Sequence, residues 1–410
     1  MKVTITPTRL RGVLTPPPSK SQSHRLIIAA ALSDGFCHLS NVLLSDDIQA
    51  TLRCMRTLDA DASADGTIIR GADLVDGHDD PAPELMDCGE SGSTLRFLIP
   101  LALALKGKGR FTGHGRLMER PQEPYFRIFE EKGISYELKD NILTVEGKLT
   151  PGVYSLPGDV SSQFVTGLLF SLPLLDGDSE IHLTTDLESR GYVDMTLDAL
   201  EQFEVKVEWD GKRTFQVPGN QIYRHRDLTI EGDYSQAAFW YAAIGVGNEM
   251  DLEGLNAFSV QGDMRIVPYW LRLREVGEQE LDVSQCPDLV PPLAAHAVLR
   301  AGETTRLVNA ARLRLKESDR LATVTEVLTA LGGDVEEGPD FLTFHGKETL
   351  PGGVTVSAHN DHRIAMMAAI AATRCEAPVT ITGAECVKKS YPHFWEDYEA
   401  MGGQIVREEE

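Results

Sequence analysis

Residues 160–169 read V-S-S-Q-F-V-T-G-L-L, a short polar stretch that opens into an apolar run. Five further copies of this design occur, and most copies start about seventy residues apart, a fixed period that indicates a repeat architecture. They begin at Ser19 (S-K-S-Q-S-H-R-L-I-I-A-A-A-L), Cys88 (C-G-E-S-G-S-T-L-R-F-L-I-P-L), Gly232 (G-D-Y-S-Q-A-A-F-W-Y-A-A-I-G), Cys286 (C-P-D-L-V-P-P-L-A-A-H-A-V-L) and Ala358 (A-H-N-D-H-R-I-A-M-M-A-A-I-A). Each copy places Ser, Asp or Asn where a helix needs its N-cap, and the apolar run predicts a buried helix.

Each buried helix is followed by a similar series of elements. A short strand comes first, as at residues 109–113 and 379–383, and an amphipathic second helix follows it. We expect the second helices at residues 46–58, 121–133, 192–203, 264–276, 316–331 and 392–401. A hairpin then closes the unit, and its last strand is expected at residues 67–71, 143–147, 215–219 and 342–346. The pattern predicts an α/β protein built from six related units.

The sixth unit stops near residue 406 and lacks its closing strand. The N-terminal segment K-V-T-I-T-P has strand character and no unit of its own, so we expect it to supply that strand. Residues 18–229 would then form one lobe of three units, and residues 1–17 with 230–410 would form the second. A chain of 410 residues favours two domains, and a cleft between lobes is where ligands usually bind.

The composition excludes several classes of function. A net charge of −23 argues against nucleic acid and anionic membranes as partners, because both require a broad basic surface. The chain has no apolar run long enough for a transmembrane helix and no signal-peptide core at its start, which favours a cytoplasmic protein. The six cysteines lack metal-ligand spacing and suit reduced, buried thiols. No cluster of His, Cys and carboxylates has metal spacing, so no metal or cofactor is expected.

Cationic and hydroxyl side chains gather at the starts of the first three buried helices. Lys20, Ser21 and Arg25 begin the first helix, where free N–H groups and the helix dipole favour an anion. The second helix start contributes Gly92, Ser93 and Arg96, and the third contributes Ser161, Ser162 and Gln163. A solvated basic patch and ordinary helix capping are the alternatives. Lys and Arg oppose the dipole in a first turn, however, and such departures from a local rule often mark functional residues.

The segment R-L-R-L-K-E-S-D-R-L at residues 312–321 is the strongest functional signal of the second lobe. We expect Lys316 and Arg320 to form an i, i+4 pair on one helical face, with Glu317 beside them at the helix start. A surface helix with internal salt bridges is the alternative. Asp288, Arg363 and Lys389 are expected at the starts of the remaining helices of this lobe. With no P-loop in the chain, these cations predict phosphorylated and carboxylated small molecules as ligands.

Five motifs occur in order along essentially the whole chain. They are P-P-S-K-S-Q-S-H-R, E-S-G-S-T-L-R, R-L-K-E-S-D-R-L, N-D-H-R-I-A-M and K-K-S-Y-P-H-F. Together they resemble the EPSP synthases, the 3-phosphoshikimate 1-carboxyvinyltransferases. The resemblance implies a two-lobed inside-out α/β barrel in which each lobe has three βαβαββ units with buried helices. It also implies transfer of the enolpyruvyl group of phosphoenolpyruvate to the 5-hydroxyl of shikimate 3-phosphate, with release of phosphate, in the shikimate pathway to chorismate and aromatic amino acids.

The resemblance also implies roles for individual residues. Shikimate 3-phosphate would be bound by Lys20, Ser21, Arg25, Ser161, Ser162, Gln163, Ser189, Asp288 and Lys316. Phosphoenolpyruvate would be bound by Lys20, Gly92, Arg120, Gln163, Arg320, Arg363 and Lys389. Glu90 and Arg312 depart from the residues that many members carry at these positions, and no role is assigned to either.

The reaction needs a base for the hydroxyl and an acid for the methylene carbon, and two separately tuned carboxylates can serve. Asp288 is the expected base and Glu317 the expected acid, while Lys20 and Lys389 would stabilise the departing phosphate. One alternative is the related enolpyruvyl transferase of UDP-N-acetylglucosamine, in which a reactive loop cysteine is expected. The corresponding residues 116–121 contain none. The other alternative is a non-catalytic anion-binding protein. A monomer is expected.

Overall fold

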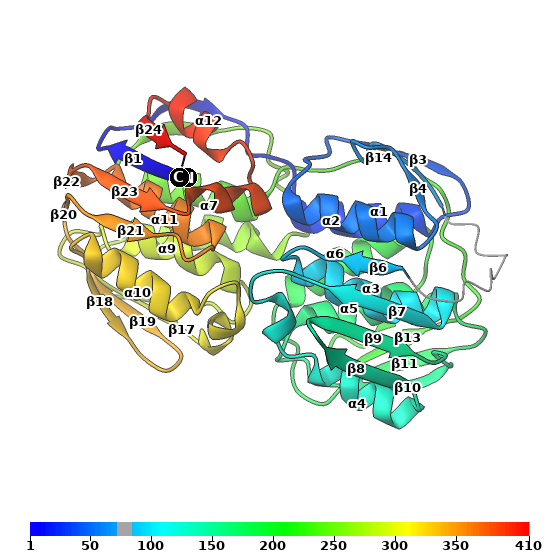
Figure 1. Ribbon diagram of the computed structural model, residues 1–410. Helices are drawn as coiled ribbons and strands as arrows, with labels where there is room; N and C mark the ends of the chain where they lie inside the picture. Colours follow the sequence, from blue (N-terminus) through cyan, green and yellow to red (C-terminus); the bar gives the residue numbers. More distant parts are fainter. Residues whose placement is uncertain (72–83, 410) are drawn as a thin grey trace. The chain divides into compact units, whose positions relative to one another are not determined.

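The computed structural model describes residues 1–71 and 84–409. The chain divides into two compact units, one made of Met1–Ser19 with Glu231–Glu410 and the other of Lys20–Ile230. Each unit combines helices with small, mostly four-stranded sheets, as Figure 1 shows. The α/β class predicted from the repeat is confirmed.

In the described part of the chain, all six copies of the repeat form a helix with a mainly buried surface. These helices are α1 (Lys20–Ala31), α3 (Gly92–Lys106), α5 (Ser162–Ser171), α7 (Tyr234–Gly245), α9 (Val290–Ala297) and α11 (His362–Ala372). A helix that is apolar on all sides has to be enclosed, and α11 illustrates this because every one of its residues is buried. Asp361 caps it by accepting a hydrogen bond from the backbone N–H of Arg363.

The second helices lie where the amphipathic pattern predicted them, apart from shifts at their ends. They are α2 (Asp46–Thr57), α4 (Glu123–Lys132), α6 (Arg190–Gln202), α8 (Ile266–Leu273), α10 (Arg320–Ala330) and α12 (Phe394–Ala400). The largest shift is at α10, which begins at Arg320 rather than at residue 316. Asp319 is its N-cap and accepts from the backbone N–H of Ala322, whereas Lys316 has an extended conformation after a 3-10 turn, η5 (Ala311–Leu315). The predicted helical i, i+4 pair of Lys316 and Arg320 is therefore wrong.

Two further predicted helix starts need correction. Asp288 lies in a 3-10 turn, η4 (Pro287–Leu289), and α9 follows it without a side-chain cap. The prolines at the start of α9 have no backbone N–H and therefore cannot donate a hydrogen bond to a capping side chain. Lys389 lies at the end of another 3-10 turn, η6 (Ala384–Lys389), and α12 begins only at Phe394.

Five of the sheets share one topology, in which a parallel pair of strands is extended by two further strands in antiparallel register. In the Lys20–Ile230 unit the first two of these sheets have the order β14 (Leu228–Thr229), β3 (Phe36–Ser40), β5 (Ile68–Arg70), β4 (Asp61–Ala62) and the order β6 (Leu85–Asp87), β7 (Lys108–Thr112), β9 (Ile142–Glu146), β8 (Ser135–Lys139). The third has the order β10 (Gly152–Leu156), β11 (Ser179–Leu183), β13 (Thr214–Val217), β12 (Glu208–Trp209). The repeated order explains the repeated sequence pattern.

The other unit contains the two remaining four-stranded sheets and two small parallel pairs. The four-stranded sheets have the order β16 (Gln279–Asp282), β17 (Thr304–Val308), β19 (Leu342–His345), β18 (Asp334–Glu337) and the order β21 (Thr355–Ser357), β23 (Val379–Thr382), β1 (Lys2–Thr6), β24 (Gln404–Glu408). The parallel pairs join β2 (Arg11–Leu14) to β15 (Glu249–Leu252) and β20 (Leu350–Gly352) to β22 (Cys375–Ala377). The fourth repeat, which is the short one, thus has only the pair of β15 with β2 in place of a four-stranded sheet.

The N-terminal strand completes the sixth repeat, as expected. In Figure 1 the blue β1 lies between the orange β23 and the red β24, and it pairs with both in antiparallel register. Val3 and Ile5 on this strand are fully buried in the core of the unit. Residues from the two ends of the sequence therefore share one sheet.

The apolar side chains form two separate core clusters, and each belongs to one unit. The six cysteines are buried free thiols. Over residues 1–71 and 84–409, no helix combines the length and apolar character that a membrane span requires.

Candidate functional site

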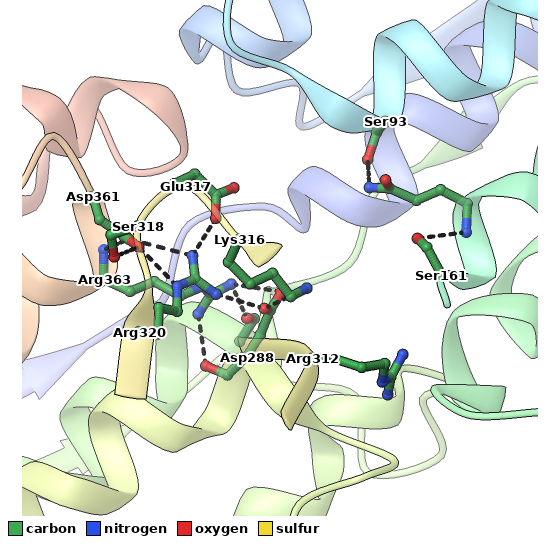
Figure 2. A network of polar contacts seen from close by, with 12 residues as sticks. Ser93, Ser161, Asp288, Arg312, Lys316, Glu317, Ser318, Arg320, Asp361 and Arg363 are labelled. Carbon is green, nitrogen blue, oxygen red and sulfur yellow. Dashed lines mark hydrogen bonds and ion pairs between the residues drawn. The ribbon is translucent and has the colours of Figure 1, made fainter. Parts of the chain in front are cut away.

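The predicted site residues fall into two groups, one on each unit. In the unit that contains both chain ends, the group is centred on Arg320 at the start of α10. Its guanidinium is only 1% exposed and contacts three carboxylates, as Figure 2 shows. The Arg320–carboxylate distances are 2.8 Å to Asp288, 2.7 Å to Glu317 and 2.8 Å to Asp361.

Burial and charge act in opposite directions on the protonation of Arg320. Burial alone lowers its pKa, but the negative charges of Asp361, Glu317 and Asp288 outweigh burial, and the pKa lies above its usual value. The side chain is therefore a permanent cation. It holds the two predicted proton-transfer groups, Asp288 and Glu317, on either side of one rigid planar group.

Asp288 is surrounded by cations. Besides Arg320, its carboxylate contacts Lys316 Nζ at 3.3 Å and Arg363 Nη2 at 3.4 Å. Arg363 also donates to the backbone carbonyl of Asp288 at 3.1 Å and to Ser235 Oγ at 2.5 Å. Three cationic side chains, Lys316, Arg320 and Arg363, thus contact the Asp288 carboxylate. An anionic ligand that attracts Lys316, Arg320 or Arg363 would change the charge balance around this carboxylate.

Lys389 lies beside the start of α11, although its own turn comes from a later part of the chain. Its ammonium group donates to the backbone carbonyl of Asn360 at 2.6 Å, one residue before Asp361. Five of the predicted site residues therefore lie together in this unit: Asp288, Lys316, Glu317, Arg320 and Arg363. Lys389 is connected to the start of α11 by its contact with the Asn360 carbonyl.

Two residues to which the sequence assigned no role lie in or beside this group. Asp361 is completely buried and accepts from Arg320 and from Ser318 Oγ, at 2.8 and 3.0 Å. Its position directly before His362, the first residue of α11, offered a signal for an N-cap but none for an ion pair with Arg320, which lies about forty residues earlier. Arg312 lies at the edge of the group in Figure 2 and donates to the Ser284 carbonyl at 2.5 Å.

In the Lys20–Ile230 unit, α1 carries Lys20, Ser21 and Arg25. Lys20 Nζ forms an ion pair of 2.8 Å with Asp47 of α2, a partner that sequence reasoning did not identify. Arg25 is almost fully buried, and its guanidinium donates to the carbonyls of Ser21 and Tyr192 and to Thr196 Oγ1. Burial lowers the pKa of Arg25 to about 10, although Tyr192 partly counteracts the shift. At neutral pH it is a buried cation.

A second cluster of this unit joins the starts of α3 and α5. Arg96 donates to Gln163 Oε1 at 2.9 Å, and Gln163 Nε2 donates to Ser93 Oγ at 3.0 Å. Arg120 is buried beside Gly92: a Cβ added to Gly92 would lie 2.9 Å from Arg120 Nη1. The buried Arg120 Nε has no hydrogen-bond partner among the described residues. An arginine in such a position is suited to an anionic ligand.

Three serines lie at the starts of helices in the same unit. Ser161 is the N-cap of α5 and accepts from the backbone N–H of Gln163, while Ser162 begins the helix. Ser161 Oγ also lies 3.5 Å from Arg96 Nη1. Ser189 precedes α6 with a φ of 55°, a left-handed conformation that is uncommon for a residue other than glycine. Such strained residues are frequent at ligand sites.

The two groups offer different chemistry. The Lys20–Ile230 unit presents Lys20, Arg25, Arg96 and Arg120 with serine hydroxyls at helix starts, a combination that binds phosphate and carboxylate groups. The other unit adds cations and the carboxylates Asp288 and Glu317, which can accept and donate protons. Within the described residues, no group of three or more His, Cys, Asp or Glu side chains has an arrangement that could hold a metal ion.

Comparison with known proteins agrees with this chemistry. The family model of EPSP synthase (3-phosphoshikimate 1-carboxyvinyltransferase) matches residues 5–398. A relative named 3-phosphoshikimate 1-carboxyvinyltransferase from Clostridium kluyveri is 47% identical, with 98% of each chain covered. A relative of the same name from Clostridioides difficile is 43% identical and covers 98% of this chain and 97% of its own.

Solved structures show the same fold at lower identity. An EPSP synthase from Acinetobacter baumannii is 24% identical with a TM-score of 0.79, covering 99% of this chain and 100% of its own. The enolpyruvyl transferase NikO from Streptomyces tendae is 18% identical with a TM-score of 0.75, covering 99% and 98%. The fold is thus that of the enolpyruvyl transferases. Because the chain matches the family model over almost its whole length, it belongs to the EPSP synthase family.

Proposed function

We propose that this chain transfers the enolpyruvyl group of phosphoenolpyruvate to the 5-hydroxyl of shikimate 3-phosphate, with release of phosphate. Membership in the EPSP synthase family supports the assignment. The observation that carries it is the position of Asp288 and Glu317 on the two sides of the buried Arg320 guanidinium. An anion-binding protein without catalysis would have no need for two partly exposed carboxylates among its cations.

Shikimate 3-phosphate is the larger ligand and is assigned the hydroxyl-rich helix starts. Its residues in this proposal are Lys20, Ser21, Arg25, Ser161, Ser162, Gln163, Ser189, Asp288 and Lys316. Phosphoenolpyruvate, with a phosphate and a carboxylate, is assigned the arginine-rich positions. Its residues are Lys20, Gly92, Arg120, Gln163, Arg320, Arg363 and Lys389. Both sets include residues of both units of the chain.

The first step of the proposed reaction is an addition. The oxygen of the 5-hydroxyl attacks C2 of phosphoenolpyruvate while Asp288 accepts the hydroxyl proton. Glu317 donates a proton to C3, which becomes a methyl group. Arg320 contacts both carboxylates, at 2.8 and 2.7 Å, and thereby keeps them in a defined geometry. The product of this step is a tetrahedral adduct that still carries the phosphate.

The second step is an elimination. Glu317 removes a proton from the new methyl group, the C2–O bond to phosphate breaks, and the enol ether double bond forms. Lys20 and Lys389 stabilise the negative charge on the departing phosphate. The proton on Asp288 leaves with phosphate or solvent, so protons and charge balance over the cycle. In this proposal the enzyme is a cytoplasmic monomer.

The test is an assay of phosphate release by the purified protein with both substrates, followed by 31P NMR of the product. Turnover that requires both substrates and gives an enol ether on shikimate 3-phosphate supports the proposal. A parallel reaction with UDP-N-acetylglucosamine tests the related acceptor, and turnover there alone would replace the proposed acceptor. Binding of both substrates without any phosphate release would favour the non-catalytic alternative. Light scattering of the same sample tests the monomer.

A further inference from the structure

A layer of buried polar side chains lies on helices of the Lys20–Ile230 unit that carry or adjoin its proposed ligand-binding residues. Its members are His24, Thr51, Thr94, Thr166 and Thr196, and all five are completely buried. They come from α1, α2, α3, α5 and α6, helices whose other buried side chains are mainly apolar. Because an unpaired polar group in such a core is costly, the hydrogen bonds of this layer constrain how the helices pack.

The first half of the layer joins α1 and α2 by two polar contacts one turn apart. Lys20 contacts Asp47 at 2.8 Å, and four residues further along each helix His24 Nδ1 lies 2.7 Å from Thr51 Oγ1. Residues four apart lie on the same helical face. The position of Lys20 relative to α2 is therefore set by the ion pair itself and by the hydrogen bond beneath it.

The number of hydrogens available to each group determines which residue donates in each hydrogen bond from His24 to Thr94. The pKa of His24 lies well below its usual value because the ring is buried, and Lys20 and Arg25 lower it further, so the imidazole is neutral. His24 Nε2 has no partner among the described residues. We therefore assign the proton to Nδ1, since the other tautomer would bury an unpaired N–H donor. His24 then donates to Thr51, and the single hydroxyl proton of Thr51 is left for Thr94, at 2.7 Å.

The chain of hydrogen bonds ends at the start of α3. Thr94 Oγ1 donates to Ser91 Oγ at 2.8 Å, and Ser91 is the N-cap that precedes Gly92. Ser91 Oγ also accepts from the backbone N–H of Thr94 at 3.1 Å. Loss of the Thr51 hydroxyl would remove a hydrogen-bond partner from both His24 and Thr94. This series therefore connects the element that carries Lys20 to the element that carries Gly92.

The second half of the layer lies under Arg25. Thr196 Oγ1 accepts from Arg25 Nε at 2.9 Å and donates to the Tyr192 carbonyl at 3.1 Å. Its remaining contact is with Thr166 Oγ1 at 2.9 Å, so the Thr166 hydroxyl is the donor of that hydrogen bond. Thr166 lies one turn after Ser162 on α5. This half connects the guanidinium of Arg25 to the helix that begins with Ser162.

We infer that the two threonine pairs are positioning residues with separate duties: Thr51 and Thr94 position the phosphoenolpyruvate-binding elements, and Thr166 and Thr196 position those for shikimate 3-phosphate. The inference rests on the proposed function. None of the four threonines touches a substrate in this account. Thr51 and Thr94 act through two substrate-binding residues, Gly92 and Lys20. Thr166 and Thr196 act through Arg25 and Ser162.

The test compares four single variants, Thr51→Val, Thr94→Val, Thr166→Val and Thr196→Val. Valine keeps the branched shape of threonine and replaces the hydroxyl with a methyl group. The first two variants should raise the KM for phosphoenolpyruvate by about tenfold or less, the usual effect of one hydrogen bond, and the KM for shikimate 3-phosphate by a smaller factor, because Lys20 is assigned to both substrates and Gly92 to phosphoenolpyruvate alone. Thr166→Val and Thr196→Val should raise the KM for shikimate 3-phosphate and change the KM for phosphoenolpyruvate little. Thr94→Ser and Thr196→Ser keep the hydroxyl and should retain both constants.

The matched control is Thr305→Val, which removes another fully buried hydroxyl that accepts from a buried arginine, Arg300, at 2.5 Å in the other unit. It should lower the melting temperature without changing either KM. Equal changes of both constants in all four variants, or loss of stability alone, would overturn the inference and assign the layer to packing. Failure of the proposed function would look different, because the wild-type protein itself would then show no turnover.

Discussion

Arg320 and Asp288 form an ion pair of 2.8 Å, although one begins α10 and the other lies in the turn before α9. The same guanidinium reaches Glu317 and the fully buried Asp361. Because Asp361 caps α11, one arginine connects the starts of three helices. This arrangement places the two proposed proton-transfer groups on a common support, and it makes their function and the stability of the unit depend on one residue.

Glu317→Gln and Asp288→Asn should each lower kcat by about 10²–10⁴-fold, because each substitution removes a proton-transfer group while keeping its shape. Steady-state assays with both substrates measure the effect. Glu337→Gln is the matched control, since Glu337 is also a partly exposed glutamate paired with an arginine, Arg314, at 2.9 Å. The control should retain wild-type kcat. A Glu317→Gln enzyme with normal kcat would remove Glu317 from the proposed mechanism.

Arg320→Met should destabilise the protein by about 3–5 kcal/mol, because it leaves the buried Asp361 carboxylate without its cation. Urea unfolding followed by circular dichroism measures this loss. Arg320→Lys keeps the charge but loses the planar group that contacts three carboxylates. It should therefore be more stable than the methionine variant and still show a raised KM for phosphoenolpyruvate. Equal stability of the wild type and Arg320→Met would contradict the role of Arg320 in the support.

Gly92→Ala should raise the KM for phosphoenolpyruvate with little loss of stability. The new Cβ would lie 2.9 Å from Arg120 Nη1 and 3.3 Å from Gln163 Oε1, so these side-chain ends have to move while the backbone stays in place. A double-mutant cycle with Arg120→Ala tests the cause. If the methyl group acts through Arg120, its effect on KM should largely disappear in the Arg120→Ala background. Additive effects would show that the methyl group acts elsewhere.

Two buried histidines should make the protein less stable as the pH falls. Burial, together with Arg300 and Arg274, lowers the pKa of His296 to about 3, and His24 is also shifted well below its usual value. In the unfolded chain both rings take up protons below about pH 6.5, whereas the folded protein keeps them neutral. Unfolding therefore binds protons in this range, and the free energy of unfolding falls with decreasing pH.

The measurement is urea unfolding at several pH values between 6.5 and 4 for wild type and His296→Gln. Between the two pKa values, each such histidine contributes a slope of about 1.4 kcal/mol per pH unit. His296→Gln should reduce the slope by up to this amount. An unchanged slope in the His296 variant would show that this ring is protonated in the folded state.

The sequence alone determined the parts of this structure that depend on neighbouring residues. The repeated change from polar to apolar residues predicted all six buried helices, because a helix without a polar face has to be enclosed. The strand character of K-V-T-I-T-P and the incomplete sixth unit together predicted that β1 joins the C-terminal strands. Family membership followed from motifs spread over the whole chain. Even the start of α10 was available locally, since Asp319 is a good N-cap before Arg320.

Only the tertiary structure decided which side chains contact each other between helices. The ion pair of Arg320 with Asp361 and the hydrogen bond of Thr51 with Thr94 each join residues about forty positions apart, at distances set by how the helices pack. Within one helix, contacts follow from the spacing along the chain, whereas contacts between helices depend on the rotation and depth of each helix in the core. The buried hydroxyl layer had no signal in the sequence, because a threonine in an apolar helix reads like any other β-branched residue until its partner is known.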